Sequence, residues 1–214
     1  MNTILNEIKD MYFKKKDSII SRLKEFSEVF KKDDNEIFGE LAFCLLTPQS
    51  KAKICHKSIL SLKENGLLYS GSSEQILSSL IGIRFKERKS VYIVKARDFF
   101  SENGEIKIKP KFKDFSNNYE IREWLVKNIK GMGYKEASHF LRNIGMGEDI
   151  AILDRHILKN LNLLNIIEDI PKSLTKKRYF EIENKMRKFS QYIKIPMSHL
   201  DILFWSKETG EIFK

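Results

Sequence analysis

Two helical patterns joined by a Gly-x-Gly turn constrain this chain of 214 residues more than any other feature. Apolar residues recur at helical spacing between residues 121 and 129, and again between residues 137 and 144. Between them, Gly131 and Gly133 can take positive φ and let another backbone approach closely. The segment therefore predicts a helix–hairpin–helix unit, whose second helix begins with free N–H groups suited to a phosphate.

A lysine and an aspartate follow this turn at fixed spacing. Lys135 comes two residues after Gly133, and Asp154 comes nineteen residues later, where a third helix is expected to begin. The segment resembles the helix-hairpin-helix, Gly/Pro-Asp superfamily of DNA glycosylases, in which the hairpin reads G-x-G-x-K and an essential aspartate follows at this distance. Over nearly its full length the chain is most similar to the archaeal-type, second-class 8-oxoguanine DNA glycosylase/lyases.

The expected fold class is all-α, with two helical subdomains, a DNA-binding cleft between them and the hairpin unit over residues 120–145. The resemblance implies one subdomain from residues 1–32 and 165–214, and a second from residues 33–164. Periodicity and turn residues predict helices over residues 2–32, 34–46, 72–82, 86–103, 155–164, 176–192 and 196–209. A further helix is predicted after residue 50 and ends at residue 65.

Two local patterns in the first half of the chain carry more specific predictions. Ser72 and Gln75 form a candidate capping box at the start of a helix. Residues 105–112 alternate Ile and Lys, which is a strand-like period. Pro110 and the lack of an apparent partner strand favour a loop or a short edge piece instead.

The resemblance gives Lys135 and Asp154 catalytic roles. An amine attacks only when it is unprotonated, and the positive field at a helix N-terminus favours the neutral form. Lys135 would attack C1′ of a flipped nucleotide, expel the base, form a Schiff base and permit β-elimination of the 3′ phosphate. Asp154 would stabilise the developing oxocarbenium charge and help to take a proton from the lysine. The simpler alternatives are a phosphate-binding lysine and an aspartate that only caps a helix.

The resemblance also implies a set of DNA contacts. Gln49, in Thr-Pro-Gln, would fill the hole left by the flipped nucleotide, and Arg84 would lie near the unpaired opposite base. His156 would lie near the DNA backbone, and the hairpin around Gly131 and Gly133 would bind the backbone through its amides. For His156 a role in capping or solvation remains open, and the basic stretch after Arg84 is also typical of a solvated helix face.

Contacts to the damaged base are implied for Phe85, Trp205, Asp201 and Lys214. Phe85 and Trp205 would hold the base between their faces, although apolar neighbours at residues 200–204 also fit a core tryptophan. The lesion carries a proton on N7, where guanine has a bare acceptor. The resemblance implies that the terminal carboxylate of Lys214 accepts a hydrogen bond from this N–H.

Net charge and hydropathy limit the kinds of partner that this chain can have. The net charge of +10 favours a polyanion, which under the resemblance is double-stranded DNA containing 8-oxoguanine. The longest apolar run, residues 41–46, is far too short for a bilayer, and the N-terminus lacks a signal-peptide pattern. We therefore expect no membrane partner. The resemblance implies a cytoplasmic, nucleoid-associated location in a prokaryote, and a monomer.

The two cysteines, Cys44 and Cys55, exclude a four-cysteine zinc or iron–sulfur site within the chain. No cofactor and no metal bound by side chains is expected. The sequence leaves open whether backbone carbonyls of the hairpin bind a cation.

Three functions compete at this stage. The first is a bifunctional glycosylase/β-lyase that excises 8-oxoguanine. The second is the same chemistry on another oxidised base, and the third is a non-enzymatic helix–hairpin–helix DNA-binding module. Lys135 argues against the monofunctional branches of the superfamily, and the missing cysteine cluster argues against the endonuclease III branch.

Overall fold

The computed structural model describes residues 2–213, and side chains from residue 4 onward. Helices dominate the described chain, so the prediction of an all-α fold is confirmed. The helices are α1 (Asn2–Val29), α2 (Asp34–Leu46), α3 (Ala52–Glu64), α4 (Leu67–Ser70), α5 (Ser73–Ser79), α6 (Lys86–Phe100), α7 (Lys109–Phe112), α8 (Asn118–Asn128), α9 (Tyr134–Asn143), α10 (Arg155–Leu163), α11 (Lys176–Ile193) and α12 (Met197–Thr209). Among residues 4–213, no helix is both long enough and apolar enough to cross a membrane.

Side-chain caps explain where several helices begin. Ser72 and Gln75 form the predicted capping box of α5, since each side chain bonds the other residue's backbone N–H. Asp33, one residue before the expected cap, accepts a hydrogen bond from the Glu36 N–H and starts α2. The sequence thus locates these helix starts to within one residue.

A short β-hairpin interrupts the helices between α6 and α7. Its strands are β1 (Ser101–Glu102) and β2 (Glu105–Ile106), which pair antiparallel. The absence of a partner strand was therefore the wrong expectation for this piece. The partner consists of only two residues, at the end of what the sequence predicts as one helix to residue 103, so no alternating pattern marks it.

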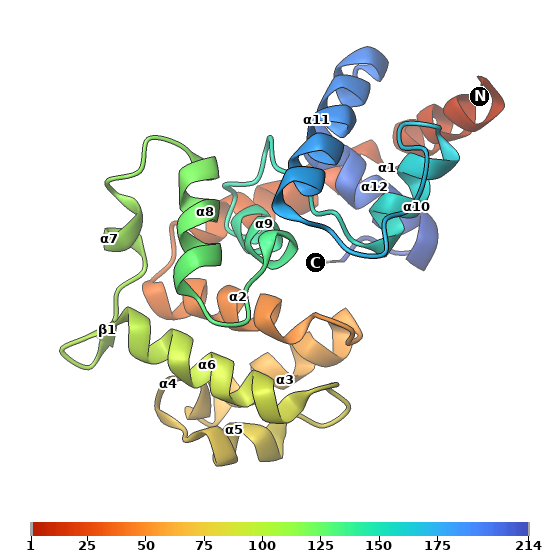
Figure 1. Ribbon diagram of the computed structural model, residues 1–214. Coiled ribbons are helices and arrows are strands. Elements are labelled where there is room, and N and C mark those ends of the chain that lie inside the picture. The colour runs from red at the N-terminus through yellow and green to blue at the C-terminus, as the bar shows by residue number, and fades with distance from the viewer. Residues whose placement is uncertain (1, 214) are drawn as a thin grey trace.

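Two hydrophobic cores organise the helices, which Figure 1 shows as two neighbouring groups with α1 running between them. The first core runs from Ile37 to Ile150 and holds α2 to α9. The second combines α1 with residues 151–204, and so includes α10, α11 and α12. The cores divide between Ile150 and Ala151, earlier than the expected subdomain boundary after residue 164. This division separates α9, which carries Lys135, from α10, which Asp154 precedes.

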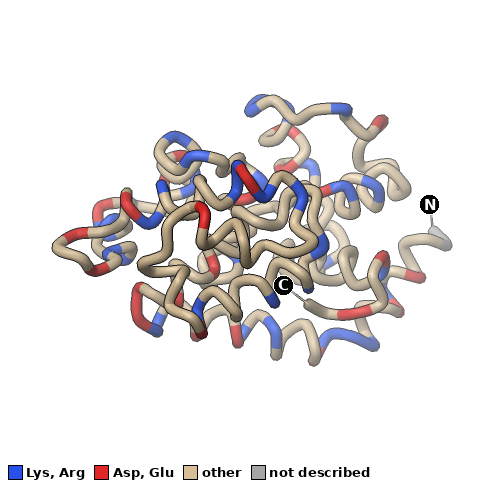
Figure 2. Tube along the Cα trace, turned by 90° about the horizontal axis from the view of Figure 1, so that it is seen from below, with Lys and Arg blue, Asp and Glu red and all other residues tan. Residues whose placement is uncertain are grey.

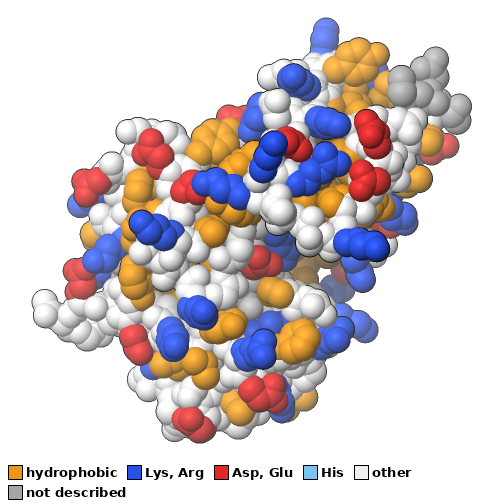
Figure 3. Space-filling view, in the orientation of Figure 1, with side chains coloured by type: hydrophobic (Ala, Val, Ile, Leu, Met, Phe, Trp, Pro, Cys, Tyr) orange, Lys and Arg blue, Asp and Glu red, His pale blue; other side chains and the backbone are white. Residues whose placement is uncertain are grey.

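Charged residues of both signs occur along the whole described trace (Figure 2). In Figure 3 the Lys and Arg side chains are spread over both groups of helices, with Asp and Glu side chains between them. The net positive charge is therefore distributed over the surface, and it does not by itself identify a site.

Candidate active site

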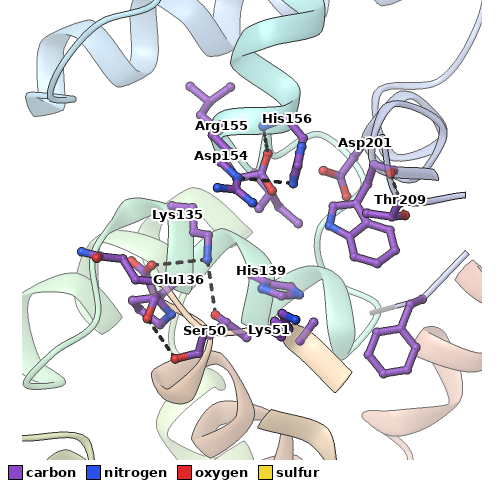
Figure 4. Close-up of a pocket in the computed structure, with 18 of the residues that line it drawn as sticks. Ser50, Lys51, Lys135, Glu136, His139, Asp154, Arg155, His156, Asp201 and Thr209 are labelled. Carbon is purple, nitrogen blue, oxygen red and sulfur yellow. Dashed lines mark hydrogen bonds and ion pairs between the residues drawn. The ribbon is translucent and has the colours of Figure 1, made fainter. Parts of the chain in front are cut away.

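A cavity of 1170 Å³ lies where the two cores meet. One wall comes from the loop after α2, the start of α3 and helix α9. The other comes from residues 152–156 and helix α12. Seven of the predicted site residues line it: Gln49, Arg84, Lys135, Asp154, His156, Asp201 and Trp205. Figure 4 shows Lys135, Asp154, His156 and Asp201 arranged around this one space.

Lys135 reaches the cavity from the first turn of α9. Its amine donates to the Thr47 hydroxyl at 3.3 Å and lies 3.4 Å from a carboxylate oxygen of Glu136 (Figure 4). Glu136 also accepts a hydrogen bond from the Gly133 N–H at 3.2 Å, and so closes the start of the helix. The lysine side chain is 24% exposed, so its amine is partly withdrawn from water yet open to the cavity.

Asp154 caps α10 and faces the same cavity. Its Oδ1 accepts hydrogen bonds from the backbone N–H groups of His156 and Ile157, at 2.8 and 2.9 Å. The capping alternative is therefore correct as local structure. The cap uses only Oδ1, so it leaves the carboxylate charge and Oδ2 available for chemistry. Capping and catalysis are compatible at this residue.

A buried ion pair connects the two walls beside these groups. Arg142 of α9 donates to Asp201 of α12 at 3.1 Å, and both side chains are almost fully buried. Burial raises the pKa of the Asp201 carboxyl to about 6, although the positive charge of Arg142 opposes the shift. The charges of Asp154 and Lys135 also act on this carboxyl, which places all four groups in one electrostatic site.

This pKa predicts a pH-dependent stability. The pKa of Asp201 is about 6 in the folded chain, above its ordinary value of 3.8, so the folded state binds this proton more tightly. The stabilisation is full below the lower value and is lost as the pH rises through the higher one. We expect the unfolding free energy of the protein minus that of an Asp201→Asn variant to fall by on the order of 3 kcal/mol between about pH 4 and about pH 7.

Urea denaturation of both proteins across this range measures that difference, and the titrating groups that do not interact with Asp201 cancel in the subtraction. Parallel stability curves for the two proteins would show that Asp201 titrates in the folded state as it does in the unfolded chain.

Trp205 of α12 also lines the cavity. It is half-buried, and its ring stands 6.5 Å from that of Phe213, at an angle of 32°. Both rings line the cavity, so Trp205 is a wall residue and is not enclosed in the core. Lys214, the predicted acceptor for the N7 proton, lies outside the described residues.

Gln49 and Phe85 occupy two adjoining loops in left-handed backbone conformation, with φ of 54° and 56°. Both side chains are exposed, and the Arg84 guanidinium lies 5.4 Å from the centre of the Phe85 ring. The Ser50 hydroxyl joins the loops, because it accepts a hydrogen bond from the Arg84 N–H at 3.1 Å. Phe85 adjoins the cavity through Arg84 but does not line it.

Lys89 of α6 anchors the loop that contains Gln49 through three hydrogen bonds. Its amine donates to the carbonyls of Leu46 and Pro48, at 2.8 and 2.7 Å, and to the Ser50 hydroxyl at 3.1 Å. The side chain is buried, and burial lowers the pKa of this amine. Sequence reasoning placed Lys89 in a solvated basic stretch. Its spacing before Ile93, by one helical turn on the buried face of α6, was the signal that could have found it.

The hairpin glycines differ from each other. Gly131 has a φ of 89°, and a Cβ there would lie 2.2 Å from the Tyr92 ring, so this position needs glycine. Gly133 has a φ of −96°, so the expectation of positive φ there is wrong. Both glycines line a separate depression formed by residues 126–133, outside the cavity that holds Lys135.

Two other cavity residues were missed or misplaced by the sequence. Arg142 carries no pattern that separates it from a surface arginine of the hairpin's second helix. His139 lies on the same helix without a marking pattern, and it is buried with its ring packed edge-on against Phe43, with centroids 5.6 Å apart. Within residues 2–213, no group of three or more His, Cys, Asp or Glu side chains is placed to hold a metal ion.

Comparisons with known proteins show the family of the chain. A family model described as 8-oxoguanine DNA glycosylase matches residues 19–195. The chain is 50% identical over 214 residues to the 8-oxoguanine DNA glycosylase/AP lyase of Fusobacterium nucleatum, which covers 100% of this chain and 99% of the relative. It is 42% identical over 203 residues to the protein of the same name from Methanocaldococcus jannaschii, with 93% of each chain covered.

Solved structures give the same result. The Methanocaldococcus jannaschii 8-oxoguanine glycosylase/lyase, in complex with a 15mer DNA containing 8-oxoguanine, superposes with a TM-score of 0.87 at 38% identity and covers 99% of this chain and 100% of that one. The Thermotoga maritima 8-oxoguanine DNA glycosylase superposes with a TM-score of 0.84 at 29% identity and covers 100% of both chains.

Proposed function

The chain belongs to the 8-oxoguanine DNA glycosylase family, and from this premise we propose that it excises 8-oxoguanine from DNA and then cleaves the strand at the abasic site. The prediction of an enzyme, a DNA N-glycosylase with lyase activity, is confirmed by the relatives, which are named 8-oxoguanine DNA glycosylase/AP lyase. The resemblance noted from the hairpin, Lys135 and Asp154 is likewise confirmed.

The observation that carries the mechanism is the placement of the Lys135 amine and the Asp154 carboxylate on one cavity of 1170 Å³. This volume is large enough for a flipped nucleotide, since ligand pockets generally enclose about 300–1000 Å³. Lys135 is the proposed nucleophile. Its nitrogen lone pair forms a bond to C1′, and the electrons of the glycosidic bond leave with the base. Opening of the sugar gives an imine, and loss of a C2′ proton then expels the 3′ phosphate.

Asp154 is the proposed electrostatic partner. Positive charge develops at C1′ as the glycosidic bond breaks, and a fixed carboxylate beside it lowers the energy of that state. The two N–H groups of α10 hold Oδ1, so the carboxylate needs no reorganisation during the reaction. The same group can accept a proton from Lys135 before the attack.

The other predicted site residues, in the cavity and on the loops and hairpin around it, are proposed to bind DNA and the base. Trp205 and Phe85 offer ring faces for stacking, and Asp201 supplies a polar group at the buried end. Gln49 and Arg84 stand on the exposed loops, where a duplex with one nucleotide removed has unpaired groups to satisfy. His156 and the hairpin around Gly131 and Gly133 are proposed to bind phosphates.

The finer expectations on partners and location follow from this function. All residues of the proposed site come from one chain, which supports action as a monomer on double-stranded DNA. Because the proposed substrate is genomic DNA, we also propose a cytoplasmic, nucleoid-associated location in a prokaryotic cell.

Borohydride trapping tests the proposal directly, because only an imine is reduced to a stable protein–DNA cross-link. Duplexes with 8-oxoguanine, with an oxidised pyrimidine and with no lesion are each mixed with the protein and borohydride. We expect a cross-link mainly with 8-oxoguanine. Equal cross-linking of the oxidised pyrimidine would replace the proposed base, and no cross-link on any damaged duplex would remove the imine mechanism.

Binding to undamaged duplex is predicted to be salt-sensitive. Arg84, Lys86 and Arg88 are exposed beside the cavity, and the hairpin amides add a further phosphate site. Each phosphate contact contributes about −0.9 to the slope of log affinity against log salt. We expect the slope of log affinity against log salt, measured by fluorescence anisotropy, to correspond to several phosphate contacts. It should become shallower after the three residues are changed to Gln.

The change Lys9→Gln, on the exposed face of α1, is the control and should leave the slope unaltered. A native slope shallower than about one contact would argue against a DNA-binding cleft.

A further inference from the structure

The segment just before Asp154 takes its backbone partners from side chains of α11. The Ala151 N–H donates to the Glu183 carboxylate at 2.8 Å. The Tyr179 hydroxyl donates to the Ala151 carbonyl at 2.7 Å and accepts from the Leu153 N–H at 3.3 Å. Residues 151–154 have no regular secondary structure, and Ala151 and Leu153 are buried. These side-chain bonds therefore satisfy backbone groups that would otherwise need a neighbouring strand or water as a partner. Two side chains therefore fix the path by which the chain enters Asp154.

The same hydroxyl also reaches the helix that carries Lys135. Tyr179 lies 3.3 Å from the Ser138 hydroxyl, which in turn accepts a hydrogen bond from Arg122 at 3.2 Å. Ser138 is three residues after Lys135 on α9, and residues at this spacing lie on one side of a helix. Tyr179 thus contacts both the helix that carries Lys135 and the segment that leads into Asp154.

A buried ion pair holds the network in place. Arg122 of α8 binds Glu183 of α11 through two hydrogen bonds, of 2.7 and 2.9 Å, and both residues are buried. The guanidinium is surrounded by four rings, with centres 4.9 to 5.9 Å from its carbon: Tyr119, Tyr134, Tyr179 and Phe180. A bidentate pair fixes orientation as well as distance, and desolvation makes such pairs poor sources of stability. Their value here is geometric.

We propose that Tyr179, oriented by the Arg122–Glu183 pair, is a positioning residue that sets Asp154 against Lys135. This inference rests on the proposed function. Lys135 lies on α9, which packs in the first core, and Asp154 follows the start of the second, so their separation depends on how the cores are linked. Tyr179 supplies one such link through its hydroxyl, beside the Arg122–Glu183 and Arg142–Asp201 pairs. Without it, two buried backbone groups lose their partner and residues 151–153 can shift, which moves Asp154.

The test removes the hydroxyl and keeps the ring. Tyr179→Phe retains the contacts with the rings of Tyr134 and Phe180. We expect the single-turnover rate of 8-oxoguanine release to fall by about 10-fold to 100-fold, as for misplacement of a catalytic group by about 1 Å. Affinity for the damaged duplex should change by less than about twofold, because no proposed DNA contact is altered. The matched control is Tyr12→Phe, which removes a hydroxyl bonded to His199 at 2.9 Å and should keep the native rate.

A double-mutant cycle with Asp154→Asn separates positioning from general damage. If Tyr179 acts through Asp154, then Tyr179→Phe should slow the Asp154→Asn protein by less than about twofold. A native rate for Tyr179→Phe, or the same loss in both backgrounds, overturns the inference while a slow Asp154→Asn protein upholds the function. A native rate for Asp154→Asn overturns the proposed mechanism, and the inference with it.

If Tyr179→Phe gives no folded protein, Ser138→Ala takes its place in the cycle. It removes the hydroxyl that joins Tyr179 to α9, and the same outcomes apply.

Discussion

Replacement of Lys135 by Gln is expected to abolish base release and strand cleavage together. Both steps pass through a bond between the lysine nitrogen and C1′, and an amide nitrogen has no available lone pair to form it. Affinity for the damaged duplex should remain near native, because one cation among several basic residues at the cleft is lost. Gel assays of base release and nicking, with anisotropy for binding, measure the three quantities.

The matched control is Lys185→Gln, which makes the same charge change on the exposed face of α11. It should leave base release, nicking and trapping at native levels. Ordinary turnover by the purified Lys135→Gln protein would refute the nucleophile assignment. A protein that still releases the base but no longer nicks would indicate that water attacks C1′ and that lysine acts only afterwards.

Replacement of Asp154 by Asn is expected to slow base release by on the order of 10² to 10³, the usual loss when electrostatic stabilisation of a transition state is removed. Asparagine caps helices about as well as aspartate, so α10 should still begin at Arg155. The change therefore removes the charge and keeps the cap.

Single-turnover kinetics gives the rate, and far-UV circular dichroism with a thermal melt checks the fold. Asp33→Asn is the control, because Asp33 caps α2 in the same way. A slow Asp154→Asn protein with a native melt supports the catalytic role. Loss of helical signal in this variant alone would make capping the principal role of Asp154.

The sequence predicts best what depends on short spacing. The Gly131 turn, the capping box of Ser72 and Gln75, and the start of α10 at Asp154 each rest on residues only a few positions apart. The family resemblance carried by this segment implies that Lys135 and Asp154 act together, and both side chains line one cavity. Local conformational preference and a family motif suffice for such features.

What the sequence could not predict depends on contacts between distant segments. Arg122 and Glu183 are 61 residues apart, and Lys89 binds carbonyls more than 40 residues earlier. Each of these residues is charged, and by composition alone a charged residue is expected at the surface. Only the fold shows that each of these residues has a hydrogen-bonding partner in the interior. The division of the cores after Ile150 has the same origin, because α10 packs with α12 rather than with the hairpin.

The left-handed conformations of Gln49 and Phe85 imply that thermal stability and the proposed repair activity favour different residues at these two positions. An L-residue held in this region costs about 1 kcal/mol relative to glycine. A stability-guided redesign would therefore favour glycine at both positions, and the melting temperature would rise. It would also erase the two side chains that the loops present to DNA. Stabilising changes in this enzyme should be sought away from the cleft, because at its rim the strained residues are the proposed working ones.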